Sequence, residues 1–140
     1  MDELDHRLIA ALRADARAPA AVLAKMLKVS RGTVQNRLAR LQASGAILGF
    51  TIRTPPAHEE GRVRAIMAIA VEGDRSGAVL AALKGLPQVE AVHVTNGRWD
   101  MLAELDTASL ADFGRALDRV RAIPGVTASE TSLLLATHWL

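Results

Sequence analysis

The apolar residues of this 140-residue sequence follow two different spacings, which together predict an α+β fold built in two parts. Up to about residue 45, apolar residues recur every three or four positions, the spacing of amphipathic helices. From residue 63 onward, short runs rich in β-branched residues alternate with helical stretches, a pattern typical of a sheet covered by helices. We therefore predict two domains, 1–53 and 63–140.

A linker is predicted between them, over residues 54–62. This stretch, TPPAHEEGR, has two prolines, a glycine and mixed charges, and it supports neither helical nor strand periodicity.

The N-terminal domain begins with two predicted helices. The first starts after Asp2, has acidic residues in its first turn, where the helix dipole favours them, and ends near residues 15–18. The second is shorter and starts with Pro19, which is tolerated at a first helical position. Their apolar stripes are Leu4, Leu8, Ile9 and Leu12 in the first helix, and Leu23, Met26 and Leu27 in the second. A tight link over residues 28–30 leads to a third helix, so the pattern predicts a helix-turn-helix.

The third helix has a clear start and end in the sequence. Ser30 is the predicted N-cap, and Gly45 stands where a left-handed C-cap is expected. Val34, Leu38 and Leu41 form its buried stripe, and the opposite side carries residue types that bind bases and phosphates. We predict base contacts for Arg31, Thr33, Gln35 and Asn36, phosphate-binding or helix-holding roles for Lys28, Arg37 and Arg40, and a capping role with a possible phosphate contact for Ser30.

The charge distribution supports a partner that is a polyanion. The net charge is +5 over residues 1–54 and −3 over residues 55–140, and no acidic residue occurs between Ala16 and His58. A solvated basic face would be the plainer explanation, but the basic run coincides with the helix-turn-helix pattern. Double-stranded DNA is the expected partner.

Residues 47–53 are expected to form a strand after the third helix. The residues leave two alternatives open, a wing of the helix-turn-helix domain or a strand that pairs with a partner chain.

The C-terminal half reads as strand, helix, strand, strand, helix, strand. The predicted elements are Val63–Val71, Arg75–Leu86, Val89–Thr95, a strand around 101–105, a helix capped by Ser109, and Val126–Trp139. A Leu-Pro pair at 86–87 and an Ile-Pro pair at 123–124 lie at equivalent places, 37 residues apart. This repeat predicts a ferredoxin-like βαββαβ sandwich. Its uncovered sheet face, expected to be rich in Val, Ile and Leu, predicts a homodimer.

A hairpin is predicted at residues 95–100, TNGRWD, because Asn-Gly is the strongest short hairpin signal. This stretch can be a simple turn, or it can contribute to a binding site.

The N-terminal stretches LDHRLIAALRADAR and LAKMLKVSRGTVQNRLARLQASGAILGF resemble the DNA-binding domain of the Lrp/AsnC (feast/famine) transcriptional regulators. The matching positions are Leu4, Asp5, Ser30, Val34, Arg37, Arg40, Leu41, Gly45 and Ile47, and the likeness extends over the whole chain. Two positions depart from the pattern: Gly32 stands where the family usually has a small hydroxyl residue, and Asn36 where a basic residue is common. The base sequence that this helix recognises is therefore expected to differ from that of well-known members.

The resemblance also implies a small-molecule site between subunits at the 95–100 hairpin, where Gly97 and Asp100 match the family's Gly-x-x-Asp. The expected effector is an amino acid or a related metabolite, and dimers are expected to assemble into tetramers or octamers. The candidate effector-binding residues are Asn96, Gly97, Arg98, Trp99, Asp100, Thr131 and Ser132.

An enzyme is the main alternative, because sirohaem decarboxylases resemble these regulators in architecture. The chain has no Tyr, and its acidic C-terminal half does not suit a tetrapyrrole. An effector-binding module without DNA contact is disfavoured by the basic helix. We therefore expect no catalytic residues, no cofactor and no metal site. The absence of cysteine and of a leader or membrane-spanning run predicts a cytoplasmic protein.

Overall fold

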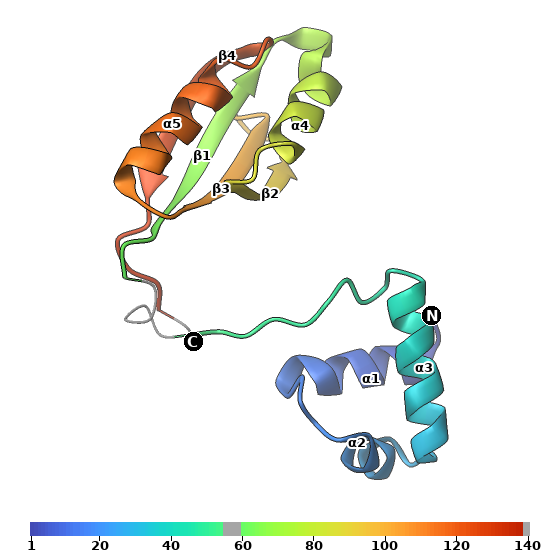
Figure 1. The fold of residues 1–140 in the computed structure, drawn as a ribbon. Helices are drawn as coiled ribbons and strands as arrows, with labels where there is room; N and C mark the ends of the chain where they lie inside the picture. The colour runs from blue at the N-terminus through green and yellow to red at the C-terminus, as the bar shows by residue number, and fades with distance from the viewer. Residues whose placement is uncertain (55–59, 139–140) are drawn as a thin grey trace. The chain divides into compact units, whose positions relative to one another are not determined.

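The computed structural model describes residues 1–54 and 60–138, and the chain divides into two units, Met1–Arg53 and Thr54–Leu140 (Figure 1). Most of the predicted linker lies at 55–59, outside the described residues. No helix in the described part of the chain is long and apolar enough to cross a membrane.

The N-terminal unit consists of α1 (Glu3–Ala14), α2 (Ala20–Leu27) and α3 (Arg31–Ala43). Pro19 is the N-cap of α2 and not its first helical residue, a one-position correction to the prediction. The three helices bury one shared cluster, which consists of Leu8, Leu12, Leu23, Ala24, Leu27, Val34 and Leu41. The apolar stripes predicted from the sequence supply most of this core, but Met26 is wrong, because it lies on the outer side of α2 and is 57% exposed.

Residues 46–54 form no strand, and the described residues contain no wing. The wing alternative is therefore wrong for the isolated chain. A strand needs a neighbour to pair its backbone groups, and the described residues provide none here. Leu48, Phe50 and Ile52 are all exposed, at 96%, 50% and 81%.

The C-terminal unit has the predicted βαββαβ order. It consists of β1 (Val63–Val71), a short 3₁₀ helix (Gly73–Arg75), α4 (Ser76–Lys84), β2 (Val89–Val94), β3 (Met101–Thr107), α5 (Leu110–Arg121) and β4 (Val126–Leu133). The strands form one antiparallel sheet in the order β2-β3-β1-β4, and α4 and α5 lie on the same face (Figure 1). The ferredoxin-like fold is confirmed.

The core of this unit lies between the sheet and the two helices. Alternate residues of β1 and β3 point into it, and α4 and α5 cover them. Its fully buried members include Met67, Ile69, Met101, Leu105, Val79, Leu83 and Val120.

The opposite sheet face is less apolar than predicted. Because side chains alternate along a strand, this face carries Arg64, Ile66, Ala68 and Ala70 of β1, Leu102, Glu104 and Asp106 of β3, and Ala128, Glu130 and Ser132 of β4. Small apolar and charged side chains are therefore mixed where a continuous Val, Ile and Leu surface was expected.

The last strand is also shorter than predicted. β4 ends at Leu133, opposite Ala65 near the start of β1, and Leu134 makes one more backbone bond of 2.8 Å to the carbonyl of Arg64. β4 therefore ends opposite the third residue of β1, and residues 135–138 form no strand; Trp139, the predicted end of the strand, lies outside the described residues.

Candidate DNA-binding and effector-binding sites

The N-terminus of α3 is capped as predicted. The Ser30 hydroxyl accepts a hydrogen bond of 3.0 Å from the Thr33 amide, and the two hydroxyl groups lie 2.8 Å apart. The helix ends at Ala43 with Ser44 as its C-cap, and the left-handed conformation predicted for Gly45 lies one residue beyond that cap, with φ 73°.

The exposed side of α3 gathers four of the predicted DNA contacts. Thr33, Asn36, Arg37 and Arg40 line a shallow depression of about 290 Å³. Their spacing of three, four and seven residues places them along one face of the helix. Arg31 and Gln35 are exposed but lie outside this group, and Lys28 lies before the helix.

Two carboxylates of α1 hold the arginines of this depression, which the sequence did not reveal. Arg37 forms ion pairs with Asp2 and with Asp5, the latter at 3.0 Å from Nη1 to Oδ1. Arg40 Nη2 lies 2.8 Å from Oδ2 and 3.0 Å from Oδ1 of Asp5. The Asp5 side chain is only 1% exposed.

Asp2 and Asp5 also cap α1 reciprocally. The Asp5 amide donates to Asp2 Oδ1, and the Asp2 amide donates to Asp5 Oδ2, each at 3.0 Å. The Arg37 hydrogen bond, followed by the bond from the Asp5 amide, lowers the pKa of Asp2 to about 2. The pKa of Asp5 is lowered too, first by the bond from the Asp2 amide and then by Arg37. Both carboxylates are therefore ionised at neutral pH and are available to the arginines.

Lys28 occupies the turn between α2 and α3 in a left-handed conformation, with φ 57° and ψ 46°. It is the one residue other than glycine with positive φ in the described part of the chain. This conformation costs a residue with a Cβ about 1 kcal/mol or more, and such strain often marks functional positions.

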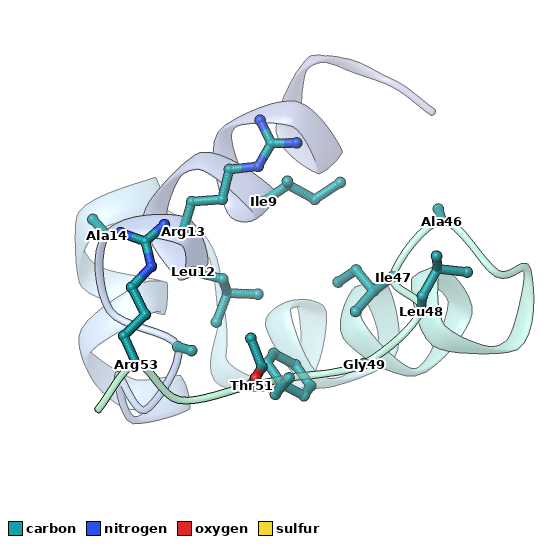
Figure 2. Close-up of a pocket in the computed structure, with 12 residues that line it drawn as sticks. Ile9, Leu12, Arg13, Ala14, Ala46, Ile47, Leu48, Gly49, Thr51 and Arg53 are labelled. Atoms are coloured by element: carbon teal, nitrogen blue, oxygen red, sulfur yellow. The ribbon is translucent and has the colours of Figure 1, made fainter. Parts of the chain in front are cut away.

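A groove lies beside these helices, between α1 and the segment 46–53 (Figure 2). Ile9 and Leu12 of α1 and Ile47 and Phe50 of the segment give it apolar walls, and its volume is about 630 Å³. Arg13 also contributes to its lining.

The second predicted site, the loop 95–100, connects β2 to β3 as expected but is not a two-residue turn. Such a turn needs positive φ at Asn96 and Gly97, and neither residue has it. The loop is closed by a bond of 3.0 Å from the Thr95 amide to the Asp100 carbonyl, and the Thr95 hydroxyl donates to the Trp99 carbonyl.

Asp100 ties this loop to β1. Its backbone amide donates to the carbonyl of Ile69 at 3.0 Å, and its Oδ2 accepts from the amide of Val71 at 2.7 Å. Next to it, the Arg98 guanidinium lies 5.4 Å from the centre of the Trp99 ring. This is a cation–π distance.

Thr131 and Ser132 do not join the loop within one protomer. They pair with Met67 and Ile66, whereas Asp100 binds at Ile69 and Val71, which are two to five residues, or roughly 7–17 Å, further along β1. Because neighbours on a strand point to opposite faces, Thr131 faces the helices and Ser132 faces the uncovered side. The structure therefore brings 95–100 together and leaves 131–132 apart.

Comparison with known proteins identifies both units. A family model described as the AsnC-type helix-turn-helix domain matches residues 1–42, and one described as the Lrp/AsnC ligand binding domain matches residues 64–139.

Relatives of similar length match nearly the whole chain. HTH-type transcriptional regulator LrpA1 of Halobacterium salinarum is 31% identical over 134 residues, covering 95% of this chain and 94% of that protein. HTH-type transcriptional regulator FL11 of Pyrococcus horikoshii is 28% identical over 138 residues, covering 99% and 91%. The fold is similar to that of a transcriptional regulator from Neisseria meningitidis solved in complex with L-Met, with a TM-score of 0.76, 19% identity, and coverage of 97% of this chain and 90% of that one.

The relatives are named as transcriptional regulators, and these comparisons give the sirohaem decarboxylase alternative no support. The chain therefore belongs to the Lrp/AsnC family and is a transcriptional regulator, with a helix-turn-helix DNA-binding domain and a ligand-binding domain, rather than an enzyme.

Proposed function

We propose that this regulator binds a specific DNA sequence through the exposed face of α3, as a dimer whose assembly responds to an amino acid. The observation that carries the DNA part is the depression lined by Thr33, Asn36, Arg37 and Arg40. Hydroxyl, amide and guanidinium groups on one helix face are the donors and acceptors that match base edges and phosphates in the major groove. Lys28, Ser30, Arg31 and Gln35 complete the proposed contact surface.

The test compares the affinities of the full-length protein and its variants for DNA duplexes of different sequence. The preferred sequence is first selected from a random duplex pool, and affinities are then measured by fluorescence anisotropy. Asn36→Ala should relax the preference at one base position, whereas Arg40→Ala should weaken binding to all duplexes and lower the salt slope by about one unit. Gln42→Ala, an exposed amide in the last turn of the same helix, serves as the control. Unchanged preference and slope in both variants would remove the assignment of this face.

The dimer is proposed to form through residues 46–53 and the uncovered sheet face. Leu48, Phe50 and Ile52 are exposed and alternate along this segment, which is the side-chain pattern of a strand and suits pairing with the same segment of a second copy. The groove beside this segment offers apolar surface for the same contact (Figure 2). In such a dimer the two recognition helices would lie about one DNA turn, or a multiple of it, apart on a pseudo-palindrome. Association into tetramers or octamers is part of the same proposal.

The effector is proposed to be an amino acid bound at the loop 95–100 between copies. The ligand-binding-domain match supports a small-molecule ligand, and the similar Neisseria regulator was solved with L-Met. A site between copies also accommodates Ser132, which faces the uncovered side of the sheet, whereas the Thr131 hydroxyl is buried on the helix side.

An amino acid presents a carboxylate and an ammonium, and a buried site must satisfy both. The amides of Asn96 and Arg98 are the proposed donors to the carboxylate, because the Gly97 amide already binds Thr95 Oγ1 at 3.3 Å. The proposed partner of the ammonium is the second oxygen of Asp100, since Oδ2 is bound to Val71. Titration calorimetry across the twenty amino acids tests this directly. Absence of binding heat together with an unchanged oligomer size would leave 95–100 as a connecting loop only.

A further inference from the structure

We propose that Asp5 is a positioning residue for DNA recognition, which holds Arg37 and Arg40 as a fixed donor array and withholds part of their charge from phosphates. This inference rests on the proposed DNA-binding role of α3. It concerns a residue of α1 that lies outside the proposed contact surface.

The first step is the geometry of Arg40. One guanidinium nitrogen, Nη2, is bound by both oxygens of Asp5, at 2.8 and 3.0 Å. The arginine side chain is still 59% exposed, and its Nη1 and Nε make no hydrogen bond to the described residues. Because a guanidinium is planar, fixing one nitrogen also fixes the direction of the remaining donors. Arg40 therefore presents oriented donors to the depression it lines.

The second step is the rigidity of Asp5 itself. Its side chain is 1% exposed and receives the Asp2 amide and both arginines, while its own amide is bound by Asp2. A carboxylate with this many partners has one accessible position. Movement of α3 relative to α1 would break several charge-assisted bonds together.

The third step is charge. Asp2 and Asp5 carry two negative charges against the two positive charges of Arg37 and Arg40, so the cluster is neutral as a whole. Non-specific DNA binding depends mainly on cations that replace counterions on phosphates. A neutral cluster on α3 reduces the sequence-independent attraction to phosphates, whereas the oriented guanidinium donors can still form hydrogen bonds with DNA.

The test compares Asp5→Asn with Glu3→Gln in the full-length protein. Both substitutions remove one negative charge from the first turn of α1, but Glu3 is exposed and belongs to no ion pair among the described residues. For Asp5→Asn we expect tighter binding to a random duplex, a salt slope steeper by about one unit, and a specific-to-random affinity ratio lowered about tenfold. Glu3→Gln should leave all three near wild type. Equal effects of the two variants, or no effect of Asp5→Asn, would overturn the proposal.

A double variant separates positioning from simple unfolding. Adding Arg40→Gln to Asp5→Asn should return the salt slope to the wild-type value while the lowered affinity ratio remains. A folding defect would not produce this reversal. If Asp5→Asn fails to give a cooperative thermal transition, Asp2→Asn replaces it. The Asp2 side chain is 54% exposed, and Asn is an equally good N-cap, so the same steepening is expected to a smaller extent.

The sequence preference of the wild-type protein distinguishes a failure of this proposal from a failure of the proposed DNA-binding function. A wild type that binds all duplexes equally would contradict the proposed sequence-specific recognition. A wild type that discriminates among duplexes, with Asp5→Asn discriminating equally well, would contradict only the role given to Asp5.

Discussion

The carboxylate of Asp100 accepts a hydrogen bond of 2.7 Å from the backbone amide of Val71, at the end of the neighbouring strand. This bond continues the β1–β3 contact beyond the last paired residues and fixes the base of the loop 95–100. One oxygen of the carboxylate is thus used for structure, and the proposed ligand contact falls to the other.

The first prediction concerns the two roles given to the Asp100 carboxylate. Asn can still accept the Val71 bond but has no charge, so Asp100→Asn should keep the loop and lose the ammonium partner. We expect amino-acid affinity to fall about 10- to 100-fold, the worth of a hydrogen bond to a charged group, with little change in Tm. Calorimetry and thermal unfolding measure the two quantities, with the exposed Asp118→Asn as control. Retained affinity would make Asp100 a loop anchor only.

The second prediction concerns the strained turn before α3. Glycine adopts the Lys28 conformation without steric penalty, so Lys28→Gly should stabilise the protein by about 1 kcal/mol and raise its Tm by a few degrees. The same variant should bind DNA more weakly, with a salt slope reduced by about one unit, because a phosphate-binding charge is lost. Lys25→Ala is the control: it removes a positive charge from the neighbouring helix α2, where glycine would itself be destabilising. A Lys28→Gly variant that is more stable and binds DNA as well as wild type would remove Lys28 from the contact surface.

The third prediction concerns acid stability. The pKa of Asp2 is about 2 in the folded protein, below its ordinary value of 3.8. A carboxyl whose pKa is lowered by folding stabilises the folded state above its unfolded pKa, and this contribution is lost as pH falls through the folded pKa. The Tm difference between wild type and Asp2→Asn should therefore be largest above about pH 5 and shrink steadily towards pH 2. A difference that is independent of pH would mean that the Arg37 pair does not stabilise the fold.

The fourth prediction concerns assembly. Leu48→Asp places a charge in the proposed dimer strand, where burial without a partner is unfavourable. The variant should dissociate to monomers at micromolar concentration in sedimentation experiments. Leu110→Asp, at an apolar position of α5 that is 65% exposed, should keep the wild-type mass. Equal masses for the Leu48 variant and wild type would place the interface elsewhere.

Local features of the fold could be predicted from the sequence because their causes are local. Ser30 and Gly45 bound α3 through bonds and torsions within a few residues, and β1 has the predicted limits because its apolar run ends at both sides. Features set by distant partners could not be predicted. β4 stops at Leu133, which pairs with Ala65 near the start of β1, and residues 47–53 have strand composition but pair with no strand among the described residues.

The candidate sites divide in the same way. The exposed face of α3 follows from helical periodicity, so Thr33, Asn36 and Arg40 could be chosen from spacing alone. The pairing of Arg37 with Asp2 spans 35 residues, and nothing in either local pattern indicates it. Only the packing of α1 against α3 brings the two charges together.

The exposed Leu48, Phe50 and Ile52 also bear on the lifetime of newly made subunits. Proteases cut exposed, extended segments, and this one forms the last residues of the N-terminal unit, after its three helices. If the proposed dimer covers this segment, an unpaired subunit would be cleaved there and lose its DNA-binding half, whereas the dimer would be protected. Subunits made faster than they dimerise would then be degraded to fragments and would not accumulate as monomers. The concentration at which subunits dimerise would set a lower limit on the amount of intact protein in the cell.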